Sequence, residues 1–74
     1  MIIYFIQNFT KDLTIIFVGK DKKVKKISLN PIISLDEVID KVNEIIEDET
    51  LITEVKLKGR SSILRAIELY YNKL

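Results

Sequence analysis

The 74-residue chain contains no cysteine, no histidine and no tryptophan, and it has only one proline and two glycines. Without cysteine, no disulfide can stabilise the fold. A structural zinc site is not expected, because such sites are built from Cys and His ligands. The commonest general base and the thiol nucleophile are also absent. The composition therefore argues against an enzyme, and we expect no catalytic residue, no metal and no cofactor.

The sequence also lacks a glycine-rich phosphate loop and a serine in a nucleophile-elbow context. Its carboxylates gather between Asp36 and Asp48, largely on the solvent side of an expected helix. Asp40 and Glu44 are an i, i+4 pair, from which a two-carboxylate metal site is conceivable. A solvated helix face is the simpler interpretation, and we adopt it.

No hydrophobic run approaches the ~20 residues of a membrane span. The apolar stretch Met1–Ile6 is short and lacks the basic region of a signal peptide. Together with the missing cysteine, this composition fits a cytoplasmic protein that does not enter a membrane. The abundance of Ile, Lys and Glu suits a thermophile, although an AT-rich genome produces the same bias.

The net charge is only +1, but the charges are segregated along the chain. Five lysines stand between positions 20 and 26 against Asp21, and four cations stand between positions 56 and 65 with no acid. Between positions 36 and 49 there are seven acids against Lys41. This pattern predicts a surface with a basic side and an acidic side, or simply a set of solvated faces.

The hydrophobic pattern predicts a single small domain, residues 1–74, with four strands. Three strands rich in β-branched residues come first, and the fourth alternates strictly between apolar and polar residues. Asn30-Pro31 ends the third strand, because proline cannot donate to a sheet ladder. The expected strands are Ile2–Ile6, Leu13–Val18, Val24–Leu29 and Thr53–Lys58.

Two amphipathic helices are expected. Ser34 can cap the first, with Glu37 completing a capping box and Ile33 and Val38 forming a hydrophobic staple. Its apolar residues follow a 3.6-residue period, and the helix runs to about Asp48. Ser61 or Ser62 can cap the second. The apolar stripe of the second helix is Ile63, Leu64, Ile67, Tyr70, Tyr71 and Leu74.

The resulting fold class is α/β, of the two-layer α+β type, in the order β-β-β-α-β-α. A four-stranded mixed sheet carries two helices on one face, with a right-handed crossover through the first helix. The first two strands are nevertheless apolar on both sides. A second copy of the chain could cover the other face, which predicts a homodimer. Alternatively, Tyr4, Phe5 and Phe17 wrap around a sheet edge.

The basic segments favour binding over catalysis. Lys20, Lys22 and Lys23 crowd a hairpin turn, with Lys25 and Lys26 on the strand that follows. Lys56, Lys58 and Arg60 occupy the last strand and its exit, and Arg60 stands near a helix N-terminus whose free N–H groups can also meet a phosphate. These residues predict contacts with the backbone of DNA or RNA. The alternative is a protein-interaction module, of an accessory or viral inhibitor type, acting through an apolar or acidic surface.

The segment TEVKLKGRSSILRAIELY, residues 53–70, resembles the strand–turn–helix of the Alba superfamily, small archaeal chromatin and RNA-binding proteins. Residues that fit the family's pattern are Glu54, Val55, Leu57, Ile63, Ala66, Ile67 and Glu68. When the segment is aligned from Ile63 without gaps, Arg60 occupies the position of the family's glycine and Gly59 occupies the position of its arginine. Ile15–Lys20 is similar to the family's first strand. In the family this strand leads almost directly into the first helix, whereas in this chain an additional strand lies between them.

The resemblance implies a sheet like that of the Alba proteins and of the C-terminal domain of translation initiation factor 3. It also implies dimerisation and binding to DNA or RNA with little sequence specificity. Four residues match positions near the family's binding turns: Lys20, Lys58, Gly59 and Arg60. The near-neutral net charge favours a specific RNA, a weak contact or a protein partner over bulk packaging of DNA.

Overall fold

The computed structural model of the chain describes residues 1–30 and 34–72. The expected order of strands and helices is confirmed, with one short 3₁₀ turn added before the last strand. Three residues used in these expectations lie outside the described residues. They are Pro31 at the end of the third strand, Ile33 in the hydrophobic staple and Leu74 in the apolar stripe of the second helix. The elements are β1 (Ile2–Gln7), β2 (Leu13–Val18), β3 (Val24–Leu29), α1 (Leu35–Ile45), η1 (Glu49–Leu51), β4 (Glu54–Lys58) and α2 (Ser62–Tyr71).

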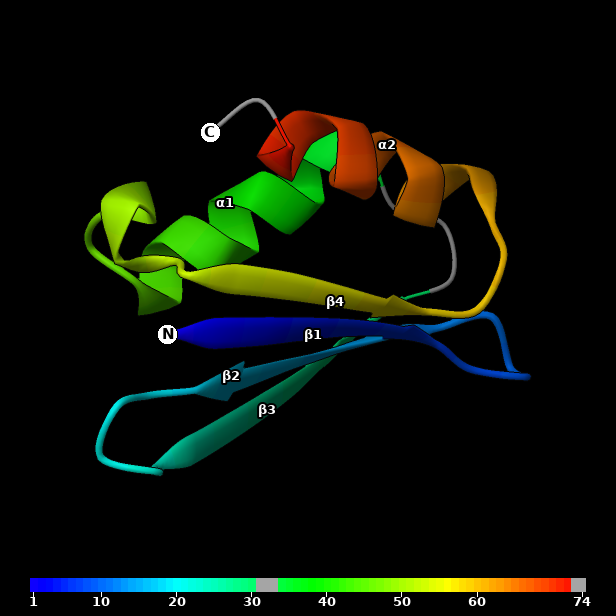
Figure 1. Ribbon diagram of the computed structural model, residues 1–74. Helices are drawn as coiled ribbons and strands as arrows, with labels where there is room; N and C mark the ends of the chain where they lie inside the picture. The colour runs from blue at the N-terminus through cyan, green and yellow to red at the C-terminus, as the bar shows by residue number, and fades with distance from the viewer. Residues whose placement is uncertain (31–33, 73–74) are drawn as a thin grey trace.

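The four strands form one mixed sheet in the order β3-β2-β1-β4. β1 pairs antiparallel with β2 and parallel with β4, and β2 pairs antiparallel with β3. The first strand therefore lies at the centre of the sheet. Both helices lie on the same side of it, as Figure 1 shows, which confirms the two-layer architecture.

Each helix begins at a serine whose side chain accepts a backbone hydrogen bond. Ser34 Oγ accepts from the Glu37 N–H at 3.2 Å, which is one half of the expected capping box. Ser61, not Ser62, caps α2, and its Oγ accepts from the Leu64 N–H at 3.2 Å. These bonds satisfy N–H groups that have no partner within the helix.

The predicted end of the first helix near Asp48 is wrong, because α1 ends at Ile45. Ile46 turns into an extended conformation and is 3% exposed, so the break places its side chain in the core. Asp48 then caps η1 by accepting the Thr50 N–H at 2.9 Å. Aspartate prefers such capping positions, and an acidic residue is unfavourable at the negative end of a helix dipole.

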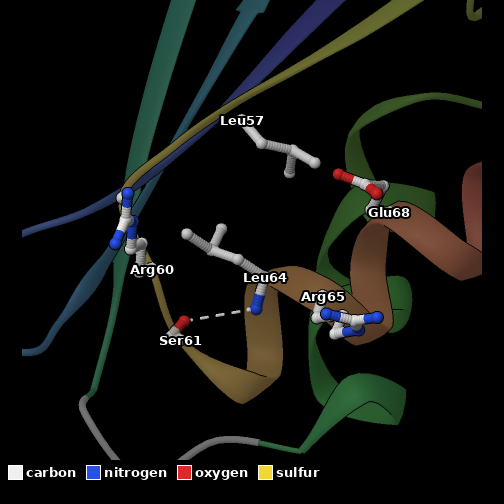
Figure 2. Close-up of a pocket in the computed structure, with 7 residues that line it drawn as sticks. Leu57, Arg60, Ser61, Leu64, Arg65 and Glu68 are labelled. Atoms are coloured by element: carbon white, nitrogen blue, oxygen red, sulfur yellow. Dashed lines mark hydrogen bonds between the residues drawn. The ribbon is translucent and has the colours of Figure 1, made fainter.

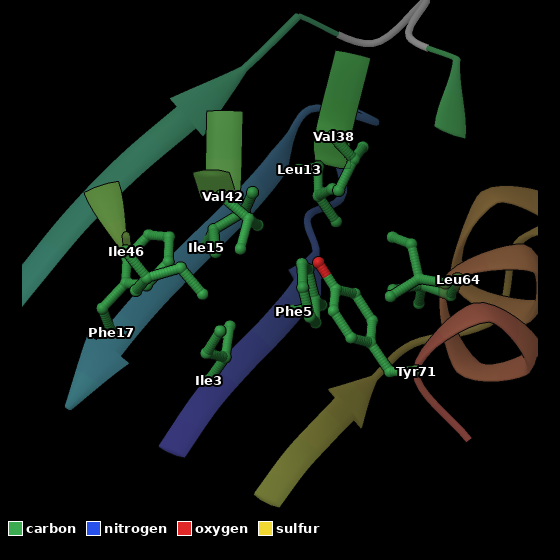
Figure 3. Packing of buried hydrophobic residues seen from close by; sticks show 11 residues of the cluster. Ile3, Phe5, Leu13, Ile15, Phe17, Val38, Val42, Ile46, Leu64 and Tyr71 are labelled. Carbon is green, nitrogen blue, oxygen red and sulfur yellow. The ribbon is translucent and has the colours of Figure 1, made fainter. Parts of the chain in front are cut away.

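The core lies between the sheet and the two helices, as Figure 3 shows. Alternate residues of β1 and β2 point into it and meet the apolar stripes of α1 and α2. Phe5 and Phe17 are 0% and 2% exposed, so the alternative that they wrap around a sheet edge is wrong. The buried residues of this hydrophobic core are Ile3, Phe5, Leu13, Ile15, Phe17, Val38, Val42, Ile46, Leu64, Ile67 and Tyr71.

The opposite face of the sheet, here called the open face, carries no helix in the described part of the chain (Figure 1). Its central row, read across the strands by their register, is Lys26, Ile16, Tyr4 and Lys56. The middle of the open face is thus apolar, and lysines stand at both of its edges.

Candidate nucleic-acid interface

The exit of β4 is shaped by Gly59. Its φ of +114° lies in the region that favours glycine, and a Cβ there would stand 2.8 Å from the Cβ of Gln7. The close approach fixes the β4–α2 junction against the end of β1. The chain then reverses, and this reversal places Arg60 directly before the cap of α2.

A cleft of about 330 Å³ opens beside the start of α2. Figure 2 shows its apolar floor, formed by Leu57 and Leu64, with Arg60 on the strand side of Leu64 and Arg65 on the helix side. The remaining lining residues are Gly59, Ser61 and Glu68. Because the first N–H groups of α2 and its dipole also lie here, the cleft favours an anionic group.

Arg65 is a residue of this site that the sequence-based prediction did not include. It lies four residues after the cap, and its backbone N–H donates to Ser61 O at 3.2 Å. A spacing of four residues returns a helix to the same side. In the sequence, Arg65 can be recognised as the cation four residues after the N-cap serine. That recognition requires knowing that Ser61, and not Ser62, caps the helix.

Lys56 and Lys58 project from β4 onto the open face, beside Tyr4 and Ile6 respectively. The Lys56 Nζ lies 3.8 Å from the Glu54 Oε1 and 5.7 Å from the centroid of the Tyr4 ring. Both lysines are exposed. Because ion pairs between exposed groups are weak, Lys56 is available to an external anion.

The second predicted group, Lys20, Lys22 and Lys23, occupies the turn between β2 and β3. The turn closes through a hydrogen bond from the Gly19 N–H to Lys23 O at 3.0 Å and one from the Lys22 N–H to Gly19 O at 3.0 Å. All three lysines are exposed, and the Lys23 Nζ lies 3.8 Å from Asp21 Oδ2.

The structure does not bring the two predicted groups together. Val18, next to the lysine turn, pairs with Ile2, whereas Lys58 pairs with Ile6. At ~3.3 Å per residue, these two rows of the sheet are about 13 Å apart along the strands. The lysine turn and the β4–α2 junction therefore lie at opposite ends of the sheet (Figure 1).

No group of three or more His, Cys, Asp or Glu side chains in residues 1–30 and 34–72 is arranged to hold a metal ion. Within the same residues, no helix has the length and apolar character needed to cross a membrane.

Comparisons with known proteins do not assign the chain to a family. It matches no protein-family model, no curated protein and no solved structure. The resemblance to the Alba superfamily stays a prediction, because no match bears on it.

Proposed function

We propose that this protein is a small, non-catalytic, Alba-like nucleic-acid-binding protein that contacts the DNA or RNA backbone through its basic turns. The observation that carries this proposal is the cleft at the start of α2, which Arg60 and Arg65 line together with the first turn of the helix. Arginine forks fit phosphate oxygens in a bidentate manner, and the helix dipole adds a favourable field. Lys58 extends the cation cluster onto the open face.

The separation of the two basic groups supports an extended polyanion over a small phosphate ligand. The molecule measures 31 Å along its longest axis, and the lysine turn and the cleft lie at opposite ends of the sheet. Duplex DNA carries one charge per ~1.7 Å of axis, so one duplex presents phosphates along the whole of this length. A mononucleotide cannot reach both ends.

Titration of the protein against labelled duplex DNA, single-stranded DNA and structured RNA tests the proposal. Each phosphate neutralised on a duplex contributes about −0.9 to the slope of log K against log[salt]. Engagement of Lys58, Arg60 and Arg65 alone therefore predicts a slope of about −2.7, and contacts by the lysine turn make the slope steeper. The absence of binding to all three nucleic acids at low salt would contradict the proposal.

Charge reversal separates the site from a general electrostatic effect. The double variant Lys58→Glu/Arg60→Glu is expected to weaken binding at least tenfold and to leave the thermal midpoint within a few degrees, because both side chains are exposed. Lys41→Glu is the matched control. Lys41 is an exposed lysine on α1 whose Nζ contacts Glu44 Oε2 at 3.4 Å. An equal loss in the control would show that no local site exists.

The second candidate is a protein-interaction module, and the acidic surface of α1 favours it. Asp36, Glu37, Asp40 and Glu44 are all exposed there. A basic protein partner would bind this surface after nuclease treatment, and Asp40→Lys/Glu44→Lys would abolish that binding. Partner binding without any affinity for nucleic acid would favour this candidate over the first.

A further inference from the structure

Two parallel rows of side chains follow the boundary between β1 and β4 on the open face. β1 contributes Tyr4 and Ile6, and β4 contributes Lys56 and Lys58 as their direct register partners. Beyond the strand ends, the β1–β2 turn carries Phe9, and the β4–α2 junction carries Arg60 at the cleft. One row is aromatic or apolar and the other is cationic. We call the two rows together the β1–β4 track.

Phe9 is fully exposed, at 107% of its reference area, although it is a large apolar residue. The turn that carries it is firmly hydrogen bonded. The Asn8 N–H donates to Asp12 O at 3.1 Å, the Lys11 N–H donates to Asn8 O at 2.9 Å, and Asn8 Nδ2 donates to Thr14 Oγ1 at 2.7 Å. A constrained turn that presents an aromatic ring to solvent indicates a ring available for contact with a ligand.

The exposed ring also lies at the end of the sheet that carries the β4–α2 junction. Gln7, two residues before Phe9, is the residue that Gly59 approaches most closely. Gln7 Nε2 further donates to Lys11 O at 2.6 Å, which joins the base of the turn to its far side. Phe9, Lys11 and Arg60 are therefore held at the same end of the sheet.

We propose that the β1–β4 track binds a single-stranded segment of DNA or RNA, with bases on Tyr4 and, past the end of β1, on Phe9, and with phosphates on Lys56, Lys58 and, at the cleft, Arg60. This inference rests on the proposed function and specifies its ligand as nucleic acid with unpaired bases. Proteins that bind single strands combine a cationic path for the backbone with aromatic rings on which bases stack. Bases in a duplex present no free faces to such rings.

Charge favours a polyanion over a second copy of the chain as the occupant of the open face. A two-fold axis that runs across the strands along this row, or along the strands midway between Ile16 and Tyr4, lays the row Lys26, Ile16, Tyr4, Lys56 over the same row of a second copy. Both orientations set lysine against lysine at each end of that row. Like charges placed opposite one another are destabilising, whereas phosphates complement them.

The test compares oligothymidylate with a duplex of equal length, using fluorescence anisotropy on the full chain. Phe9→Ser removes a fully exposed ring, and Tyr4→Leu removes the aromatic face but keeps an apolar side chain on the sheet. Each is expected to lower the affinity for the single strand about five- to a hundredfold, the range measured for loss of one stacked base, and to change duplex affinity less than twofold. Leu69→Ala, at a half-exposed apolar position on α2, is the matched control and should change neither.

The outcomes distinguish this inference from the proposed function. If Phe9→Ser and Tyr4→Leu both leave the affinity for the single strand unchanged, the β1–β4 track is not the binding site. The proposed backbone contacts at the cleft then still stand. Failure to bind any nucleic acid overturns both. Light scattering on the same samples tests the predicted homodimer. If the protein is a dimer that excess oligothymidylate does not dissociate, and no single strand is bound, the open face belongs to a second copy of the chain.

Discussion

The Tyr71 side chain is the least well satisfied polar group of the core. Its ring stacks on Phe5 with centroids 5.7 Å apart and meets the ring of Tyr70 edge-on at 4.9 Å. Its hydroxyl points inward in Figure 3 and has no hydrogen-bond partner among the described residues. A buried hydroxyl without a partner keeps its desolvation cost, so the ring stabilises the fold while its oxygen opposes it.

Tyr71→Phe is therefore expected to raise the free energy of unfolding by about 1 kcal/mol. Urea denaturation followed by circular dichroism measures the change. Tyr70→Phe is the matched control, because the Tyr70 hydroxyl donates to Glu49 Oε1 at 2.9 Å and its loss should lower stability by ~1 kcal/mol. Destabilisation by both substitutions would contradict this account of Tyr71.

Local patterns in the sequence predict the elements well and their ends less well. The apolar stripe of α2 is confirmed through Tyr71, and the strict alternation of β4 separates Val55 and Leu57, packed against the core, from the exposed lysines. The end of α1 was missed because Ile46 continues the helical period as far as the sequence shows. Tertiary packing decides instead, since the extended conformation buries Ile46.

The junction between β4 and α2 depends on Gly59. Gly59→Ala would hold an alanine at φ +114° and bring its Cβ within 2.8 Å of Gln7 Cβ. We expect a loss of about 1–3 kcal/mol in the free energy of unfolding, the usual range for a strained backbone conformation. The expected loss has two causes, the φ value and the steric conflict, and thermal or urea unfolding measures their sum.

Gly19→Ala provides the comparison for this prediction. Gly19 also ends a strand, but its Cβ would meet Asp21 Oδ1 at 2.9 Å, and that carboxylate can rotate away. Its effect should therefore be clearly smaller than that of Gly59→Ala. If the two alanine variants lose equal stability, the conformation of Gly59 is not what determines the junction.

The arrangement of the candidate site belongs to the scale of the whole molecule, and there the sequence predicts less. Each basic segment was recognisable from its lysines and arginines. Their placement at opposite ends follows from the strand directions, because β2 runs antiparallel and β4 parallel to β1, and no short segment encodes this pairing. Phe9 was missed for a similar reason: its sequence context indicates a turn, while its full exposure depends on how that turn closes.

The whole molecule should lose stability at alkaline pH. Burial raises the pKa of Tyr71, and the hydrogen bond to Glu49 raises the pKa of Tyr70, both above the ordinary value near 10. The folded state therefore keeps protons that the unfolded state releases. Stability is unaffected by these groups below about pH 10 and falls as the pH rises above it. Urea midpoints between pH 8 and 11 test this, and Tyr71→Phe should make the fall shallower.

The central position of β1 has a consequence for the order in which the chain is made. β1 is synthesised before the other strands of the sheet, yet one of its two neighbours is β4, and the contact between Met1 O and Thr53 Oγ1 spans 52 positions. β2 and β3 can add to β1 as soon as they leave the ribosome, whereas the other edge of β1 stays unpaired until β4 follows. During that interval the nascent chain exposes an apolar strand edge, which is a template for pairing with other chains. The growing polypeptide is thus most exposed to aggregation between the emergence of Gln7 and that of Glu54.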